Sequence, residues 1–571
     1  MKSKVAILVA LAAPALSACD TAEPDSVPLS IEFRASALVV DTTLDFALPP
    51  GYDHNCECEI LLPGGDEMCS LRAAVQIANA CTGHDVIEIA AAGTHNLTLF
   101  GPSAGTEAGD IDITDPVTIM TVGSIGVTVD AKAIDDRIFD IHPSAGQVML
   151  SGFKVDNGLP TASDPSAEGG CIRAHETELT LYSMVVGGDP SQTAPGDPHP
   201  GEGCVGANGG GVAAFDSSVT ATSTKFAGNE AIAAGAGDGL GGGLYAPRTN
   251  VSIEGGFVLR NAAEVGAGLH VTEPDKGGWL LLDGTTLAHN LAATHGGGGY
   301  VDVGFEIMDT TFHHNDAGFS PGHRGGALYA GPKSDGGLLL GTDMHDNSAY
   351  DGGGVAVHAK IRIEQSRFDL NEAIGSVDFP GRGGGIFVDE AGTTEIEGAS
   401  ITRNHAVLGA GVWAKGGHVA TNVTYADNEA IVAGGGIAIE GGDSVLLHTT
   451  IRDNIAPDGG GIWETGGSVR LDRSILDGNV GDECSGSVDN LGGNVSGPIT
   501  CLSAGWTPAS GPWGTLGGQP PLTFTDVIPI SPPNSAVGLA KPCGTSVDQR
   551  GISRLEEACD AGAYESDSAA G

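Results

Sequence analysis

Apolar and polar positions repeat along most of this 571-residue chain in one recurring unit. An apolar residue stands shortly before an asparagine and is followed by a variable segment, a glycine triplet such as Gly352-Gly353-Gly354, and a short alternating strand such as Ile386-Phe387-Val388. The asparagines follow one another at intervals of 24 to 33 residues, which leaves no room for crossover helices between parallel strands. The pattern therefore predicts an all-β fold, a parallel β-helix in which each coil stacks its strands on those of the coil before.

The repeated asparagines are predicted to form a structural ladder. An asparagine tolerates the left-handed backbone of a tight turn, and its amide can donate to one neighbouring coil while accepting from another. Because almost every coil carries one, we interpret these residues as structural and not catalytic. The ladder comprises Asn229, Asn261, Asn290, Asn315, Asn347, Asn371, Asn404, Asn428, Asn454 and Asn479.

The two ends of the repeat region differ from its middle. Residues 70–80 predict a short helix with Ser70 as N-cap, which would cover the open first coil. Residues 481–565 lack glycine triplets and are expected to cover the last coil, with Arg550 and Asp560 as ion-pair candidates. We thus expect an N-terminal cap and first strands over 39–109, coils over 110–480, a C-terminal cap over 481–565 and a tail over 566–571.

Several motifs resemble those of bacterial right-handed parallel β-helix proteins, a pectin-lyase-like solenoid. Cys69-Ser70-Leu71-Arg72-Ala73-Ala74 resembles the "CSLREA" motif at the start of such proteins, with Ala73 in place of Glu. Residues 548–565 resemble the "choice-of-anchor Q" region, and the Asn and Gly-Gly-Gly repeats are more loosely similar to polymorphic outer-membrane proteins. These resemblances imply a right-handed coil and specify no activity.

Composition narrows the choice of partner. The formal net charge is −46, which argues against binding nucleic acid or anionic lipid through charge. Aromatic residues make up only 5% of the chain, which suits a narrow core of Val, Ile, Leu and Ala. We expect a monomer.

The first 18 residues have the pattern of an export signal, with Lys2 and Lys4 before an apolar stretch. Leu16-Ser17-Ala18-Cys19 resembles a bacterial lipobox, which implies that Cys19 carries the lipid. Residues 19–38 would be a tether, and no apolar tail follows Glu565. The expectation is an exported lipoprotein at the outer membrane or cell surface, in contact with the membrane only through this lipid.

Ten further cysteines predict five disulfides outside the cytoplasm. Their local grouping favours Cys171–Cys204, Cys484–Cys501 and Cys543–Cys559. Cys56, Cys58, Cys69 and Cys81 would pair among themselves in an order left open, with a zinc site as the alternative. The stretch from Gly158 to Gly209, bracketed by the first of these pairs, is predicted to be one long loop that could contact a partner.

A column of aromatic residues is the candidate ligand-binding surface. The position after the first apolar residue of each strand should face outward, because side chains alternate along a strand. A row of flat rings there could stack against the sugar rings of a polysaccharide, whereas the alternative is that the rings pack on one another. The candidates are Tyr245, Tyr300, Tyr329, Phe387, Trp413 and Trp463, with His270 in the same column.

An enzyme is the competing interpretation, because polysaccharide lyases and glycoside hydrolases also use β-helices. Hydrolysis needs paired carboxylates, yet the adjacent pair Asp135-Asp136 stands in a structural motif, and basic residues such as Arg324 and Arg382 are scattered along the sequence. Two clusters have a weak claim to bind metal. They are the histidines at 289, 295, 313, 314, 323 and 345, and, for a structural calcium, Asp346, Asp427 and Asp453.

The sequence favours a non-catalytic envelope lipoprotein that uses a β-helical face for adhesion or contact with polysaccharide or another cell surface. No catalytic residue, cofactor or metal site is assigned.

Overall fold

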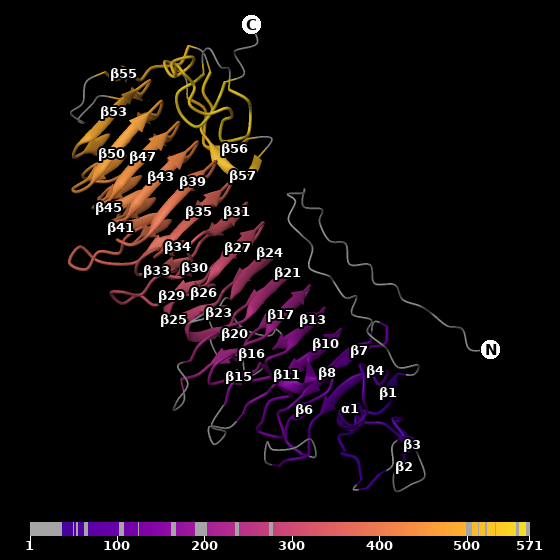
Figure 1. Ribbon diagram of the computed structural model, residues 1–571. Helices are drawn as coiled ribbons and strands as arrows, with labels where there is room; N and C mark the ends of the chain where they lie inside the picture. Colours follow the sequence, from indigo (N-terminus) through magenta and orange to yellow (C-terminus); the bar gives the residue numbers. More distant parts are fainter. Residues whose placement is uncertain are drawn as a thin grey trace, which may run out of the picture.

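The computed structural model describes residues 37–49, 51–52, 55–61, 67–101, 108–123, 125–160, 167–188, 203–233, 239–272, 278–497, 505–511, 513–519, 522–531, 533–554 and 559–566. The chain forms an elongated stack of coils, with early strands at one end and late strands at the other (Figure 1). The predicted export signal, Cys19 and nearly all of the tether lie outside the described residues.

The coils build three parallel sheets. The first is 14-stranded and contains one strand per coil: β6 (Ile111–Ile113), β9 (Phe139–Ile141), β12 (Ile172–His175), β16 (Val212–Phe215), β20 (Leu244–Pro247), β23 (Leu269–Thr272), β26 (Gly299–Asp302), β30 (Leu328–Ala330), β34 (Val355–Val357), β38 (Ile386–Val388), β42 (Val412–Ala414), β46 (Ile437–Ile439), β49 (Ile462–Glu464) and β52 (Cys484–Ser485).

The second sheet is 30-stranded and in most coils takes two successive strands: β1 (Leu38–Val40), β4 (Asp85–Ile89), β5 (Gly93–Asn96), β7 (Val117–Thr121), β8 (Val127–Asp130), β10 (Gln147–Ser151), β11 (Lys154–Asp156), β13 (Glu178–Tyr182), β14 (Val185–Gly187), β17 (Ser218–Thr222), β18 (Lys225–Ala227), β21 (Asn250–Leu259), β24 (Trp279–Ala288), β27 (Gly304–Met308), β28 (Thr311–His313), β31 (Gly337–Leu340), β32 (Asp343–His345), β35 (Lys360–Glu364), β36 (Arg367–Asp369), β39 (Thr393–Glu397), β40 (Ser400–Thr402), β43 (Gly417–Thr421), β44 (Thr424–Ala426), β47 (Asp443–Leu447), β48 (Thr450–Arg452), β50 (Ser468–Asp472), β51 (Ile475–Asp477), β53 (Val488–Gly492), β54 (Val495–Ser496) and β55 (Thr507–Pro508).

The third sheet has nine short strands: β15 (Val205–Gly206), β19 (Glu230–Ala231), β22 (Ala262–Val265), β25 (Leu291–His295), β29 (Asp316–Ala317), β33 (Ser348–Ala349), β37 (Glu372–Ala373), β41 (His405–Leu408) and β45 (Glu429–Ala433). Two antiparallel pairs lie outside the coils, β2 (Ile60–Leu61) with β3 (Glu67–Met68) and β56 (Gly517–Gln519) with β57 (Leu522–Val527). The parallel stacking confirms the predicted β-helix.

Each coil turns at positions where the backbone is left-handed. In one coil, β38 leads into β39, a bend at Gly398 (φ +66°) leads into β40, and Arg403 (φ +53°) precedes the ladder residue Asn404 and β41. The glycine triplet then makes the corner into the next coil. At Gly353 a Cβ atom would lie 2.4 Å from the backbone oxygen of Glu372, which explains why this position accepts no side chain.

The ladder asparagines join successive coils, but not by the backbone conformation that we predicted. The left-handed residue is the one before each asparagine, such as Leu370 (φ +56°), and the asparagine acts only through its amide. Asn371 Oδ1 accepts from the backbone N–H and the Nδ2 of Asn347 at 3.1 and 3.0 Å, while Asn371 Nδ2 donates to Asn404 Oδ1 and to the backbone oxygen of Met344. The same Nδ2-to-Oδ1 bond links every neighbouring pair from Asn229 to Asn479.

A buried glutamate ends this ladder. Asn479 Nδ2 donates to Glu483 Oε2 at 2.7 Å, and the N–H of Gly478 donates to Glu483 Oε1 at 3.0 Å. Glu483 is 5% exposed, and this burial raises the pKa of its carboxyl to about 7 despite the donors.

The raised pKa of Glu483 predicts a pH dependence of stability. The pKa of Glu483 is higher in the folded protein than in the unfolded chain. The contribution of this carboxyl to the free energy of unfolding is therefore fully present below about pH 4.5 and is lost as the pH rises through about 7. Between pH 5 and 8 the wild type should lose on the order of 2–3 kcal/mol of its free energy of unfolding through this group, and Glu483→Gln should not show this loss. Urea unfolding at both pH values measures it. Glu464→Gln, on a carboxylate one coil away, is the matched control, and equal pH slopes in wild type and Glu483→Gln would contradict the prediction.

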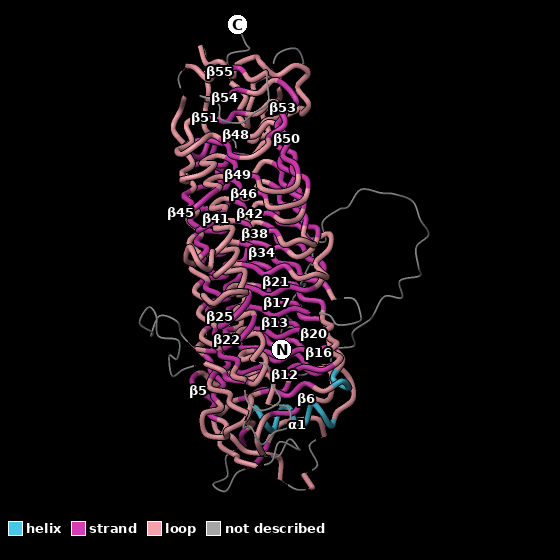
Figure 2. The backbone as a smooth tube through the Cα atoms, turned by 90° about the vertical axis from the view of Figure 1, so that its left-hand side faces the viewer, coloured by secondary structure: helices cyan, strands magenta, loops and turns pink. Residues whose placement is uncertain are grey.

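Helix α1 (Leu71–Ala80) lies near the first coils, as predicted (Figure 2), and packs against β1, β4 and β6. Ser70 Oγ accepts a hydrogen bond from the N–H of Ala73. The helix is buried on its polar side as well. Arg72 is 1% exposed, binds Asp45 Oδ1 at 2.8 Å and donates to the backbone oxygens of Gly109 and Asp110. An arginine in this place thus ties the capping helix to an early coil.

The stretch from 158 to 209 is not one loop, contrary to our prediction. Its described part contains β12, β13, β14 and β15, so it holds nearly a complete coil. The coil lacks the Asn and Gly-Gly-Gly signature, and Cys171 donates its N–H to Gly211 at the corner where other coils have a glycine. This substitution concealed the coil in the sequence.

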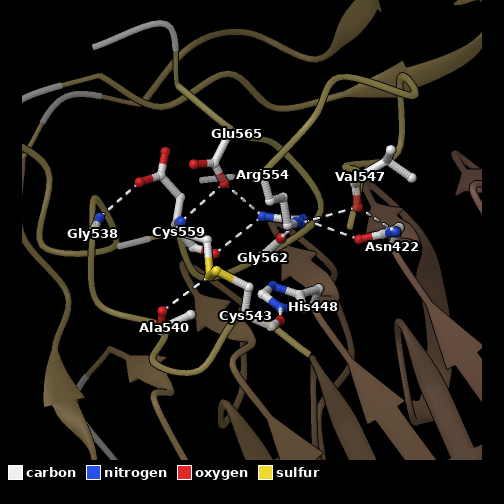
Figure 3. The surroundings of a disulfide bond; sticks show 11 residues. Asn422, His448, Gly538, Ala540, Cys543, Val547, Arg554, Cys559, Gly562 and Glu565 are labelled. Carbon is white, nitrogen blue, oxygen red and sulfur yellow. Dashed lines mark hydrogen bonds and ion pairs between the residues drawn. A yellow bond between two sulfur atoms is a disulfide. The ribbon is translucent and has the colours of Figure 1, made fainter. Parts of the chain in front are cut away.

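The C-terminal segment lies along the side of the coils and not only over the last one, which corrects our expectation. β57 packs against β36 and β40, and Figure 3 shows residues of 538–554 and 559–565 against Asn422 and His448 of two different coils. Arg554 donates to Asn422 Oδ1 at 3.0 Å, and Ala563 donates to Thr450 Oγ1 at 3.0 Å. Arg550 is paired with Asp548 (2.8 Å) and not with Asp560, which accepts N–H bonds from Gly538 and Ser566.

Disulfides support folding outside the cytoplasm. The bonds are Cys56–Cys81, Cys58–Cys69, Cys171–Cys204 and Cys543–Cys559, which settles the open pairing and excludes the zinc alternative for the first four. Cys484 is also disulfide-bonded, and its expected partner Cys501 lies outside the described residues. Among the described residues, no helix has the length and apolar character needed to span a bilayer.

Candidate functional site

The predicted aromatic positions do form one column, on the outer face of the 14-stranded sheet. Strand register pairs each member with the next, through Asp112, Asp140, Arg173, Ala213, Tyr245, His270, Tyr300, Tyr329, Ala356, Phe387, Trp413, Ala438 and Trp463. We call the part from Tyr245 to Trp463 the aromatic column.

Rings in this column stack mainly on each other. The ring centroids of Tyr300 and Tyr329 are 4.6 Å apart with planes at 7°, and those of His270 and Tyr300 are 4.7 Å apart at 5°. Phe387 and Trp413 stack at 4.8 Å. A ring face covered by a neighbouring ring cannot also receive a sugar, so the column offers chiefly ring edges.

Two of the six predicted rings are not exposed. Phe387 and Trp413 are each 1% exposed, so the prediction of a continuous outward stripe is wrong at these positions. The guanidinium of Arg382 lies 5.2 Å from the Phe387 centroid and 4.6 Å from that of Trp413, and Arg324 lies 4.7 Å from Phe387. Cation–π contact covers these rings. Tyr245, Tyr300, Tyr329 and Trp463 remain partly exposed.

The arginines come from a second column that sequence reasoning missed. Isolated parallel bridges join His295, Arg324, Asp351, Arg382 and Leu408, the residues directly before the corners that glycine makes. Arg324 and Arg382 are far apart in the sequence, but each stands directly before a glycine of a corner. This common position places them on the coils directly before and after the coil of Asp351. That position was the signal that could have identified them.

These side chains form a connected charged cluster beside the aromatic column. Asp351, fully buried, binds Arg382 through both carboxylate oxygens at 3.1 and 2.9 Å. Arg324 Nη1 donates to Asp389 Oδ2 at 3.0 Å, and His358 Nδ1 lies 2.8 Å from the same oxygen. His358 also packs 4.6 Å from the Tyr329 ring and so fills the gap left by Ala356.

Burial and charge fix the protonation of the cluster. Burial, followed by the repulsion of Arg324, lowers the pKa of His358 to about 4. Burial, followed by His323 and Arg324, lowers the pKa of His295 to about 4. Burial alone would raise the pKa of Asp389, but the Glu390 N–H, Arg324 and His358 hold it below its ordinary value. At neutral pH Asp389 is therefore a carboxylate, and the imidazoles of His295 and His358 are neutral.

The acid–base groups of this cluster are engaged with one another. Both carboxylates are occupied by guanidinium groups, and His358 Nε2 lies 3.3 Å from Arg324 Nη1, so each group that could act as a base already has a partner. The outer face combines partly exposed tyrosine rings with fixed polar groups.

The six histidines considered for a metal site separate into two groups. His295 and His323 lie near the aromatic column, since His295 is 5.2 Å from the Tyr329 ring. His289, His313, His314 and His345 gather at the turn after the 30-stranded sheet, where the His289 and His314 rings are 4.9 Å apart and those of His313 and His345 are 5.2 Å apart.

The aspartates proposed for calcium do not converge as a set. Asp346 contacts His345, and Asp453 contacts Arg452 at 2.8 Å. Within the described residues, three ligand atoms approach within 4.8 Å in His289, His313 and His314, and again in Asp112, Asp140 and His142. In the second set Arg137 and Arg173 already neutralise Asp140.

Comparison with known proteins agrees with the fold. Residues 299–480, which include Tyr300, Tyr329 and the charged cluster, match the family described as right handed beta helix region. A solved structure described as pectate lyase Pel9A aligns over 93% of this chain and 97% of its own, at 13% identity and a TM-score of 0.24, which is too low to carry an argument. A search of curated proteins gave no match. The stacked parallel sheets and the family match together identify the fold of this chain as a right-handed parallel β-helix.

Proposed function

We propose that this protein is a non-catalytic envelope protein that holds a polysaccharide along the outer face of its 14-stranded sheet. The observation that carries the proposal is the pair Tyr300 and Tyr329, partly exposed and stacked at 4.6 Å beside the cluster of Arg324, Asp389 and His358. Stacked strands repeat at about 4.8 Å, so a chain lying along the column would meet the Tyr300 and Tyr329 rings on successive coils.

The charges favour a neutral sugar polymer over a polyuronate. Arg324 and Arg382 are matched by Asp351 and Asp389, so the cluster has little net charge to attract a carboxylate. The whole chain carries −46, which repels polyanions at a distance. Sugar hydroxyl groups can still form hydrogen bonds with these polar side chains without breaking their ion pairs.

A polysaccharide lyase or glycoside hydrolase is the alternative. Its strongest candidate base is His358, oriented by Asp389 as in other histidine–carboxylate pairs. Support for binding without catalysis comes from Arg324, whose guanidinium lies against both of these groups. The two functions differ in one readout, the appearance of shortened or unsaturated products.

Tyr300→Ser with Tyr329→Ser should weaken retention on the bound polysaccharide by about tenfold to a hundredfold, because two ring contacts of about 1 kcal/mol each are lost. Affinity electrophoresis against neutral and uronic-acid polymers measures it, with product analysis on the same samples. Tyr182→Ser, an exposed ring at the end of β13, is the matched control. Equal retention of the double variant and the wild type would contradict the proposal, and products would favour the enzyme.

The proposed place of this binding face is the cell surface. Disulfides indicate an exported protein, and we propose that a lipid on Cys19 holds it at the envelope, as the lipobox-like sequence suggests. Metabolic labelling with a clickable fatty acid tests this. Label in the wild type and none in Cys19→Ala supports the anchor, and label in neither contradicts it.

A further inference from the structure

A compact group of imidazoles lies on the opposite side of the third sheet from the aromatic column, and the proposed carbohydrate function does not use it. His289, His313 and His314 each offer a ring nitrogen, and these atoms all lie within 4.8 Å of one another. His313 Nδ1 and His314 Nδ1 are 3.0 Å apart. The nitrogens of two ligands on a tetrahedral zinc ion are separated by about 3.3 Å, so this pair is already close to ligand spacing.

The β-helix itself creates the convergence. His313 and His345 are register partners in β28 and β32, so their rings stack on neighbouring coils. His289, His314 and Asp346 occupy the left-handed position (φ +56°, +53° and +54°) before three successive ladder asparagines. The amides of Asn290, Asn315 and Asn347 are bonded in the ladder, which fixes the backbone beneath each of these side chains. Five potential ligands thus stand in two columns on three rigid coils.

The surroundings also suit a cation. His345 Nδ1 lies 2.9 Å from Asp346 Oδ2, an imidazole–carboxylate pair that orients the ring and leaves Nε2 without a bond to this carboxylate. His289 and His314 are exposed, and His313 and His345 are partly exposed, so an ion can enter from solvent without opening the fold. Arg260 near His289 opposes a cation there, and Asp316, which acts on His289 with the opposite sign, offsets it.

We propose that His289, His313 and His314, with His345 as a further ligand, bind a divalent late transition-metal ion such as Zn²⁺. Neutral imidazole nitrogen is a ligand of intermediate softness that zinc, copper and nickel prefer, whereas calcium and magnesium require oxygen. The bound ion would link coils that the Asn ladder already joins, and the site stands independently of polysaccharide binding.

Zinc titration of the untagged, disulfide-intact protein by calorimetry tests the site, with Co²⁺ absorption as a second readout of tetrahedral coordination. We expect one tight ion per chain and at least a tenfold loss of affinity in His289→Asn with His314→Asn. Asparagine is chosen because it tolerates the left-handed backbone at both positions, so the variant keeps the fold.

His405→Asn is the matched control, a histidine of β41 that lies 3.6 Å from Glu372 outside the group, and it should bind zinc like the wild type. Wild-type binding no tighter than that of the double variant would overturn the proposal, as would tighter binding of Ca²⁺ than of Zn²⁺. Thermal unfolding with and without zinc provides a check independent of affinity, because an ion that binds only the folded coils raises the midpoint in the wild type and not in the double variant.

Discussion

Arg554→Met should detach the C-terminal segment from the side of the coils while leaving the coils intact. The Arg554 side chain is inaccessible to solvent, and all five of its N–H groups are bonded, to Val547 O, Asp560 O, Glu565 Oε2, Asn422 Oδ1 and Gly562 O, most of which Figure 3 shows. Methionine fills much of the volume but leaves Glu565 as a buried carboxylate without its cation. Breaking a buried pair in this way costs about 3–5 kcal/mol.

Limited proteolysis measures the effect, since the released segment should be cut while the coils stay resistant. Arg554→Lys keeps the charge with fewer hydrogen-bond donors, so its segment should be cleaved at a rate between those of the wild type and Arg554→Met. Arg362→Met is the matched control, because this arginine of β35 is largely exposed and pairs only with Glu364 on the surface. A cleavage pattern of Arg554→Met identical to that of wild type would show that the disulfide and apolar contacts hold the segment without this residue.

Asn371→Ala should cost about 3–4 kcal/mol of local stability, the second large effect. Asn371 is fully buried, and its loss removes the acceptor of two Asn347 donors and the donor to Met344 O and Asn404 Oδ1. Each buried polar group left without a partner costs about 1–3 kcal/mol. Because a solenoid is stabilised coil by coil, the damage should concentrate around β32, β36 and β40.

Hydrogen exchange resolved by peptide locates this loss, and urea unfolding gives its size. Leu370→Ala is the control in the same turn, since Leu370 is 47% exposed and makes no ladder bond, and Leu370→Gly should be neutral or slightly stabilising at its left-handed φ. If the hydrogen-exchange protection of Asn371→Ala matched that of the wild type in every coil, the ladder would contribute little to the stability of the stacked coils.

Sequence periodicity was sufficient for the coils because it repeats a physical requirement at every turn. Each coil needs a buried amide, a left-handed corner and a close backbone approach, and Asn and Gly meet these needs in a pattern that can be read without coordinates. The helix at Leu71–Ala80 was predictable for the same reason, since Ser70 and the apolar spacing specify it locally. Coils that meet the requirement with other residues, such as the one containing β12 to β14, were missed.

The contacts made on the outer surface of the coils were decided by tertiary structure. The alternation of a strand places Phe387 and Trp413 on the outer face, but it cannot reveal that Arg324 and Arg382 cover them, because the stacking of coils brings Arg324 to Phe387 from 63 positions away and Arg382 to Trp413 from 31 positions away. The path of residues 533–554 and 559–566 back along the coils depends likewise on the number of residues per coil. So does the gathering of His289, His313 and His314. The sequence by itself therefore determined a parallel β-helix with an asparagine ladder, through local requirements repeated in each coil. Only the tertiary structure decided which outer side chains are covered, paired or brought together, because that depends on the register between coils.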